Sequence, residues 1–283
     1  MSDSASNSLV EKARSYYNSA DADNFYFSVW GGEDIHIGLY ASDEEPVFDA
    51  SRRTVETMAE KVGMNEETRV LDIGAGYGGS ARYLARHYKA SVEALNLSEV
   101  ENERDRQMNR EQGLDDLINV VDGNFEHLPY ADASFDVVWS QDAILHSGDR
   151  ERVFAEVDRV LKPGGVFILT DPLQREDADK TALKPVYERI HLDNLGSLEA
   201  YDGYARALGW ERTGFEDHSD QLPRHYQRVH DILETRYDSL KETISTDYLD
   251  RMRAGLQHWV KAGRDGLLRW GLLTYRKPVS GAS

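Results

Sequence analysis

Apolar runs and helical patterns alternate along much of the chain. Short apolar segments predict strands at residues 68–73, 91–97, 117–123, 134–142 and 165–173. Between and before them we expect helices at residues 8–30, ending at Gly31 and Gly32, at 44–62, and at 149–165, where a glycine pair ends the segment. Strands that alternate with helices predict an α/β domain with a mainly parallel sheet.

This alternation weakens after Pro172. Residues 181–210 are mostly helical in pattern, and two later stretches repeat apolar residues at spacings of three and four: Tyr226, Val229, Leu233, Tyr237 and Leu240, then Leu249, Met252, Leu256, Trp259 and Val260. Residues 267–278 predict a last strand. We therefore expect a helical cap (1–62), a core (63–175), a mostly helical lid with one core strand (176–265), and a final core strand with a tail (266–283).

The composition narrows the function classes. The 283 residues include 51 acids and 33 bases, a formal net charge of −18, and no cysteine. The electrostatic field of so large a negative charge repels nucleic acids and anionic membranes, and the charge fits a protein adapted to high salt. No apolar run approaches the roughly 20 residues that span a bilayer, and no signal-peptide pattern begins the chain. We expect a soluble cytoplasmic protein, either a monomer or a weak homo-oligomer, without thiolate chemistry or a metal site.

A glycine-rich loop follows the first predicted strand. In "LDIGAGYGG", Asp72 opens the loop and Gly74, Gly76 and Gly78 follow at alternate positions. Glycines at such a loop let the backbone approach a ligand and turn into the next helix. The spacing D-x-G-x-G-x-G differs from the dinucleotide pattern G-x-G-x-x-G. It resembles motif I of the class I methyltransferases, which bind S-adenosylmethionine, whereas an ordinary strand-to-helix turn needs no such alternation.

That resemblance implies further contacts with the cofactor. Asn96 ends the second strand, where an acid usually holds the ribose hydroxyls, and Leu97 follows it. Asn124 and Phe125 stand in the region that packs the adenine, and Asp122 is either an adenine-binding acid or a solvated loop residue. The cofactor-binding set is completed by His36 and by Gln141 at the end of the fourth strand. The segment "LKPGG" (161–165) resembles the turn before the fifth strand.

Six further segments are more specific than the glycine loop. They are "DNFYFSVWGGEDIHIGLY", "NLSEVEN", "SQDAILHS", "TDPL", "GLQHW" and "RWGLLTYRKP". Together they resemble the sarcosine/dimethylglycine N-methyltransferases, which make glycine betaine by stepwise methylation of a small amino acid. The resemblance covers nearly the whole chain. It implies a Rossmann-like class I methyltransferase fold, with a mainly parallel seven-stranded sheet, flanking helices, an N-terminal helical segment and a helical lid before the last strands.

The family also resembles the phosphoethanolamine methyltransferases, in which a tyrosine and a histidine pair over the transferred methyl. This maps onto Tyr26 and His146 as catalytic residues. A quaternary ammonium favours aromatic faces, so Trp30 is a candidate residue for the wall of the substrate pocket. Trp139 is another candidate, although we expect it to pack in the core. The other substrate-binding candidates are Asp142, Tyr187 and Arg189, whose forked donors suit a carboxylate. Three lid residues are alternatives for that role: Arg224, His225 and Arg228.

Several alternatives remain at this level. The same fold and cofactor serve other acceptors, namely glycine and sarcosine, a phosphobase or a lipid-like molecule. An NAD-dependent dehydrogenase requires G-x-G-x-x-G and a ribose acid, and the sequence has neither in clean form. A protein that binds the cofactor without turnover is the third alternative. One methyl group changes discrimination by only about 1–3 kcal/mol, so sequence does not rank glycine, sarcosine and dimethylglycine.

Overall fold

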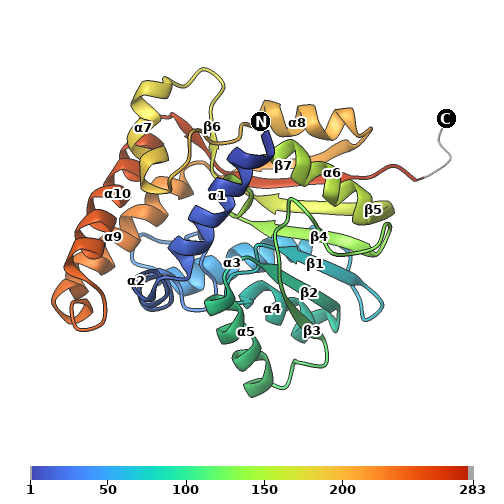
Figure 1. Cartoon of the computed structure of the whole chain (residues 1–283), viewed down its shortest axis with the longest axis horizontal. Helices are drawn as coiled ribbons and strands as arrows, with labels where there is room; N and C mark the ends of the chain where they lie inside the picture. The colour runs from blue at the N-terminus through green and yellow to red at the C-terminus, as the bar shows by residue number, and fades with distance from the viewer. Residues whose placement is uncertain (1, 280–283) are drawn as a thin grey trace.

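A seven-stranded sheet forms the centre of the computed structural model, which describes residues 2–279 (Figure 1). Its order is β3-β2-β1-β4-β5-β9-β7, and β9 alone runs antiparallel to its neighbours. The strands are β1 (Arg69–Ile73), β2 (Ser91–Asn96), β3 (Ile118–Asp122), β4 (Phe135–Gln141), β5 (Leu161–Thr170), β7 (Glu211–Asp217) and β9 (Gly271–Arg276). The predicted mainly parallel seven-stranded fold is confirmed.

Both faces of the sheet are covered because its strands carry apolar residues on both sides. Along β4, Val137 and Trp139 join one core cluster, and Phe135 and Val138 join the other. Two sets of helices cover these faces: α3 (Val47–Glu60), α4 (Gly79–Tyr88) and α5 (Glu99–Glu111) on one, α6 (Arg150–Val160) and α8 (Leu198–Ala207) on the other. The carboxyl ends of the parallel strands stay free for a ligand.

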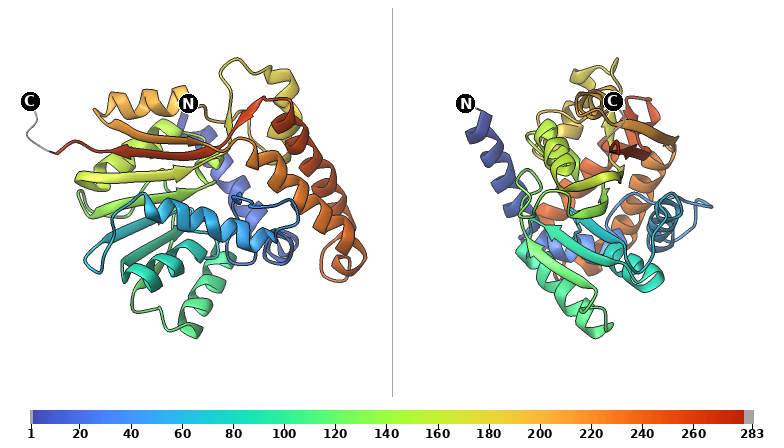
Figure 2. Two further views of the ribbon diagram at one scale, coloured as in Figure 1. Left: turned by 180° about the vertical axis from the view of Figure 1, so that it is seen from behind. Right: turned by 90° about the vertical axis from the view of Figure 1, so that its right-hand side faces the viewer.

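A third hydrophobic core lies beyond those ends and forms the lid (Figure 2). It joins α1 (Ser2–Tyr17), α2 (Ala20–Phe25) and the π-helix η1 (Tyr26–Trp30) to α7 (Lys180–Arg189), α9 (Gln221–Leu240) and α10 (Thr246–Arg264). The short strands β6 (Leu173–Gln174) and β8 (Leu268–Arg269) pair beneath it. Helix α8 and strand β7, which fall within residues 176–265, pack with the sheet layer instead.

Two local expectations were wrong. The helix expected over residues 8–30 is interrupted at Asn18 and Ser19, because Ser19 caps α2 by accepting a hydrogen bond from Ala22 N. The helix expected over residues 149–165 ends at Val160, and "LKPGG" already belongs to β5. There the strand register shifts between Phe135 and Val137, which accommodates the extra residues as a bulge. Within residues 2–279, no helix is long and apolar enough to cross a membrane.

Candidate active site

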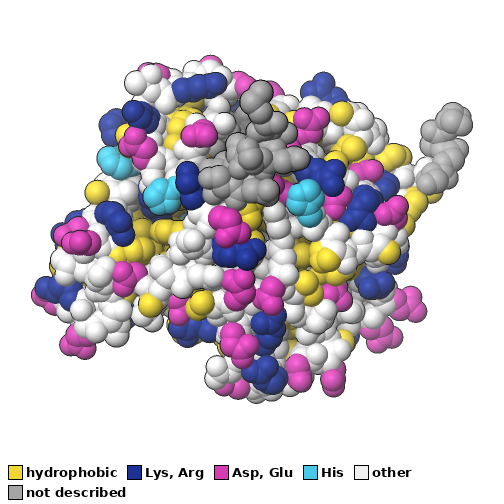
Figure 3. Space-filling view, viewed as in Figure 1, with side chains coloured by type: hydrophobic (Ala, Val, Ile, Leu, Met, Phe, Trp, Pro, Cys, Tyr) yellow, Lys and Arg dark blue, Asp and Glu magenta, His cyan; other side chains and the backbone are white. Residues whose placement is uncertain are grey.

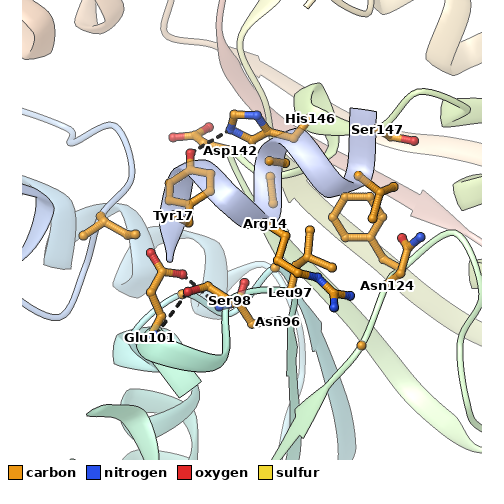
Figure 4. A pocket seen from close by; sticks show the side chains of 18 of the residues that line it. Arg14, Tyr17, Asn96, Leu97, Ser98, Glu101, Asn124, Asp142, His146 and Ser147 are labelled. Atoms are coloured by element: carbon orange, nitrogen blue, oxygen red, sulfur yellow. Dashed lines mark hydrogen bonds between the residues drawn. The ribbon is translucent and has the colours of Figure 1, made fainter. Parts of the chain in front are cut away.

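A cavity of about 800 Å³, its opening included, lies between α1 and the carboxyl ends of β1, β2 and β4 (Figure 4). This size suits a cofactor-sized ligand. Seven of the predicted cofactor-binding residues line it, together with the substrate candidate Asp142: Gly74, Gly76, Asn96, Leu97, Asn124, Phe125 and Gln141. Tyr26 and His146 line it as well, as do Val10, Ala13, Arg14 and Tyr17 of α1.

The glycine loop forms the floor of this cavity. Gly74 has a φ of 82°, and its amide donates to Leu95 O at 2.8 Å, which bends the chain away from the end of β1. A Cβ atom on Gly74 would lie 2.3 Å from the Ala143 side chain, and one on Gly78 would lie 2.0 Å from Asp105. Glycine is therefore required at both positions for the turn into α4, whereas the approach of this backbone to a ligand stays a prediction.

A smaller hollow beside the loop contains Asp72, His36 and Gln141. Burial, with Asp105 and Asp34 nearby, raises the pKa of Asp72 to about 8. Gln141 Oε1 accepts from Trp139 Nε1 at 2.9 Å, which leaves the buried Gln141 Nε2 without a partner. This hollow thus offers an acid that a cationic amino group would stabilise, and a free amide donor for a carboxylate. Trp139 itself is a core residue.

The ribose position holds a residue that the sequence interpretation missed. Asn96 Nδ2 donates to Glu101 Oε2 at 2.8 Å, while Glu101 Oε1 is buried in the cavity wall without a partner (Figure 4). Burial raises the pKa of Glu101 to about 7. Since Asn96 carries no charge, Glu101 is the carboxylate at this end of β2 and a candidate acceptor for hydroxyl groups of a ligand. Its position one turn into the helix capped by Ser98 was the available signal.

The residues predicted to pack the adenine follow the end of β3. Asp122 is exposed and does not line the cavity; its oxygens accept from Asn102 Nδ2 at 2.6 Å and from Arg106 at 3.0 Å. Asn124 Oδ1 accepts from its own loop, at Glu126 N, and Phe125 presents its ring to the cavity near Gly74. Asp122 therefore anchors α5, and the predicted loop residues line the cavity.

A tyrosine does contact His146, and it is Tyr17 of α1. The Tyr17 hydroxyl lies 2.9 Å from His146 Nε2 (Figure 4). Tyr26, the residue expected in this pair, lies next to Tyr17 with ring centroids 5.6 Å apart, and its hydroxyl is 3.3 Å from that of Tyr16. Burial, with Arg150 and Arg189 nearby, lowers the pKa of His146 to about 4, so the imidazole is neutral near pH 7. The break at Ser19 separates Tyr17 from Tyr26 and orients each toward the cavity.

Asp142 connects the site to the N-terminal loop. Its carboxylate accepts from Ile37 N at 2.7 Å and from Trp270 Nε1 at 2.8 Å, and burial raises its pKa. The backbone at Asp142 has a φ of 49°. Both oxygens already serve the protein, so Asp142 holds residues 35–39 against the sheet edge while it borders the cavity.

Arg189 lies in an aromatic box behind the Tyr17 and Tyr26 rings. Its guanidinium carbon is 5.7 Å from the Trp30 ring centroid, 5.6 Å from Tyr226 and 5.8 Å from Trp259. Its Nε and Nη2 atoms are shielded from solvent and have no hydrogen-bond partner, and no carboxylate of residues 10–279 pairs with it. Its stem crosses α10 at Gly255, where a Cβ would lie 2.6 Å from Arg189 Cδ. A half-buried cation that pairs with no carboxylate among residues 10–279 is a candidate site for an anionic ligand.

The other substrate candidates already have protein partners. Tyr187 donates to Gln174 at 2.7 Å and lies outside the cavity, and Arg224 pairs with Asp43 at 3.1 Å. Arg228 binds backbone carbonyls. His225 Nδ1 accepts from Gly38 N at 3.2 Å, and burial lowers the pKa of His225 to about 3, so it carries no charge. Arg189 is thus the candidate cation that is left available.

Known proteins match this chain over nearly its whole length. A family model described as a methyltransferase domain matches residues 71–169. A sarcosine/dimethylglycine N-methyltransferase from Halorhodospira halochloris is 57% identical over 269 residues, which cover 95% of this chain and 96% of the relative. One from Aphanothece halophytica is 52% identical, covering 95% and 98%. The chain belongs to the sarcosine/dimethylglycine N-methyltransferase family.

The fold comparison agrees with this membership. The solved structure of a candidate sarcosine dimethylglycine methyltransferase from Galdieria sulphuraria superposes with a TM-score of 0.88 at 41% identity, covering 93% of this chain and 99% of that chain. The family predicted from sequence is therefore confirmed, and the protein is a methyltransferase. The dehydrogenase alternative is excluded.

Proposed function

We propose that this N-methyltransferase converts sarcosine to dimethylglycine and dimethylglycine to glycine betaine, with S-adenosylmethionine as the methyl donor. The observation that carries the choice of acceptor is Arg189, a half-buried guanidinium in an aromatic box near His146, with two nitrogen atoms that have no hydrogen-bond partner and no carboxylate partner among residues 10–279. A small amino acid has the carboxylate that this cation lacks and the amine that receives the methyl. The curated relatives act on the same acceptors by name.

The cofactor fits the polar atoms of the cavity. S-adenosylmethionine supplies an electrophilic methyl group when bound. Glu101 Oε1 would accept from its ribose hydroxyls, and Gln141 Nε2 and Asp72 would face its carboxylate and amino group. Phe125 and Leu97 would pack its adenine. Each assignment uses an atom or surface that the protein itself leaves without a partner.

Tyr17 and His146 prepare the amine. Methyl transfer needs a neutral nitrogen with its lone pair aimed at the methyl group, so positioning supplies much of the catalysis. The neutral imidazole accepts the Tyr17 hydroxyl proton in a hydrogen bond, which leaves the phenol oxygen free to accept from the acceptor N–H. The proton released from the ammonium passes through Tyr17 toward His146 Nε2. Tyr26 and Trp30 form the aromatic wall that suits the methylated cation.

The test is an acceptor panel with the purified protein and isotopically labelled cofactor. Glycine, sarcosine, dimethylglycine and phosphoethanolamine are compared under identical salt and pH. We expect labelled dimethylglycine from sarcosine and labelled betaine from dimethylglycine. A preference for phosphoethanolamine, or cofactor binding with no turnover on any acceptor, would refute the proposal.

A further inference from the structure

Two hollows lie on opposite faces of helix α1. Val10, Ala13, Arg14 and Tyr17 line the cofactor cavity, at the spacing of one helix face. Lys12, Ser15 and Tyr16 lie on the other face and, with Ser19 just beyond the end of α1, line a wide outer groove bounded by α7 and α10. Helix α1 is thus the wall between the cofactor and this groove, as its position between the lid and the sheet in Figure 1 shows.

The groove borders Arg189. Arg189 and Gly255 lie in its lining, whereas Arg189 does not line the cofactor cavity. A small hollow lies between the two sides: Tyr17 and His146 line it together with Tyr16 and His191, which also line the groove. A path that passes Arg189 therefore reaches the reacting pair from the side away from the cofactor.

One side chain closes this path. The Tyr16 hydroxyl lies 3.0 Å from that of Tyr248 on α10 and 3.3 Å from that of Tyr26, with Met252 Sδ at 3.6 Å. These contacts join α1 to the lid across the inner end of the groove. Tyr26 and Tyr248 are buried, whereas Tyr16 is partly buried and lines the groove, so Tyr16 is the side chain whose rotation we expect to open the passage.

The charge of the groove differs from that of the protein. The whole chain has a formal net charge of −18, whereas the groove lining contains three basic and three acidic residues: Lys12, Arg189 and Arg251, and Glu11, Asp21 and Glu188. Acidic and basic side chains are also interspersed over this side of the molecule in Figure 3. A locally balanced surface admits a zwitterion, which an entirely acidic surface would repel through its carboxylate.

We propose that the groove between α1, α7 and α10 is a binding vestibule for the zwitterionic amino-acid acceptor, which reaches the reaction centre past Arg189 and Tyr16 and never through the cofactor cavity. The inference rests on the proposed acceptor class. The vestibule explains why Arg189 lies behind Tyr17 and Tyr26. The carboxylate of the acceptor stays on the groove side, next to Arg189, while its amine faces Tyr17. The vestibule also lets acceptor and product exchange while the cofactor stays bound.

The test introduces a bulky side chain into the groove and leaves Arg189, Tyr17 and His146 unchanged. Ala254 is an exposed groove residue of α10, and Lys261 is exposed on the same helix outside the groove. Ala254→Phe and Lys261→Phe, both loaded with S-adenosylhomocysteine, are mixed rapidly with dimethylglycine while the protein's tryptophan fluorescence is followed. We expect the association rate to fall at least about tenfold in Ala254→Phe and to stay within about twofold in Lys261→Phe. The affinity for S-adenosylhomocysteine should be unchanged in both.

Ser15→Phe, on the α1 side of the groove, repeats the test if Ala254→Phe does not fold. Dimethylglycine that binds at the wild-type rate to a folded groove variant would overturn the vestibule and leave the proposed function standing. Failure of the wild-type protein to bind dimethylglycine at all would overturn both. An equal fall in the association rates of S-adenosylhomocysteine and dimethylglycine would show that the two ligands share one path and would overturn the vestibule.

Discussion

At the residue scale, the candidate site depends on pairs of residues that lie far apart in the sequence. Tyr17 and His146 meet across 129 positions, and local similarity drew attention to Tyr26 because it stands in the most distinctive N-terminal segment. No periodicity in a single sequence indicates which of several tyrosines faces a histidine after the fourth strand. Asn96 was correctly placed from its strand end, whereas its partner Glu101 required knowledge of the capped turn that follows.

The Tyr17–His146 contact gives the first prediction. Tyr17→Phe removes the hydroxyl that contacts Nε2, and His146→Ala removes its acceptor; each should lower kcat for dimethylglycine by about 100-fold, a typical effect of losing a positioned acid–base group. Cofactor affinity, measured by calorimetry, should stay within about twofold. Tyr26→Phe, which keeps the aromatic wall, should reduce kcat much less. A larger loss at Tyr26 than at Tyr17 would return the catalytic role to Tyr26.

The carboxylate of Glu101 gives the second prediction. Glu101→Gln should weaken binding of S-adenosylhomocysteine by about tenfold, because hydrogen bonds to a charged acceptor contribute roughly 1.5–3 kcal/mol. The ribose hydroxyls favour the ionised carboxylate, whose pKa burial raises to about 7, so wild-type affinity should increase as the pH rises through 7. That increase should shrink in Glu101→Gln. Glu103→Gln, on the exposed side of α5, is the matched control; equal behaviour of the two variants would disprove the role.

At the element scale, the sequence was most informative where hydrophobic periodicity is strong. The strands of the parallel sheet and helices α9 and α10 lie close to their predicted ranges, because each buries a regular apolar pattern. The errors fall where a single local interaction decides: the Ser19 cap that divides the first helix, and the bulge that draws "LKPGG" into β5. The cap and the bulge leave the hydrophobic pattern unchanged, so this pattern could not predict them.

Helix α10 gives the third prediction. Gly255→Ala places a methyl group against the Arg189 stem and should displace the guanidinium, so the KM for dimethylglycine should increase at least about fivefold while that for the cofactor changes little. Gly203→Ala on α8, where an added Cβ meets nothing within 4 Å, is the control and should be neutral or slightly stabilising. Equal KM values in the two variants would remove Arg189 from the acceptor site.

At the scale of the whole molecule, buried acids and a high net charge determine how stability depends on pH and salt. The pKa values of Asp72, Glu101 and Asp171 are raised mainly by burial, to about 8, 7 and 7. Their values in the unfolded chain lie near 4, so the folded protein binds more protons in the interval between. Stability from these groups is therefore lost as the pH rises through their folded pKa values.

The fourth prediction follows from this sign. The Tm of the ligand-free protein should fall between about pH 6.5 and pH 8.5, a range above the reference pKa of histidine, so that His146 and His225 do not oppose the trend. Added salt should raise the Tm at every pH, because it screens the repulsion within a chain of formal net charge −18. Differential scanning calorimetry checks both; a Tm that rises with pH in this range would contradict the assignment of protonated buried acids.

The central claim is that Arg189 holds the carboxylate of a small amino acid whose nitrogen is methylated. The most direct measurement is steady-state kinetics of Arg189→Ala and Arg189→Lys with dimethylglycine and S-adenosylmethionine varied separately. We predict that the alanine variant raises the KM for dimethylglycine at least about 30-fold, as removal of one partner of a buried charge pair costs about 2–5 kcal/mol, with partial recovery in the lysine variant. The KM for the cofactor should change by less than about twofold. A larger effect on the KM for the cofactor than on that for dimethylglycine, or an unchanged KM for dimethylglycine in the alanine variant, would contradict this role of Arg189.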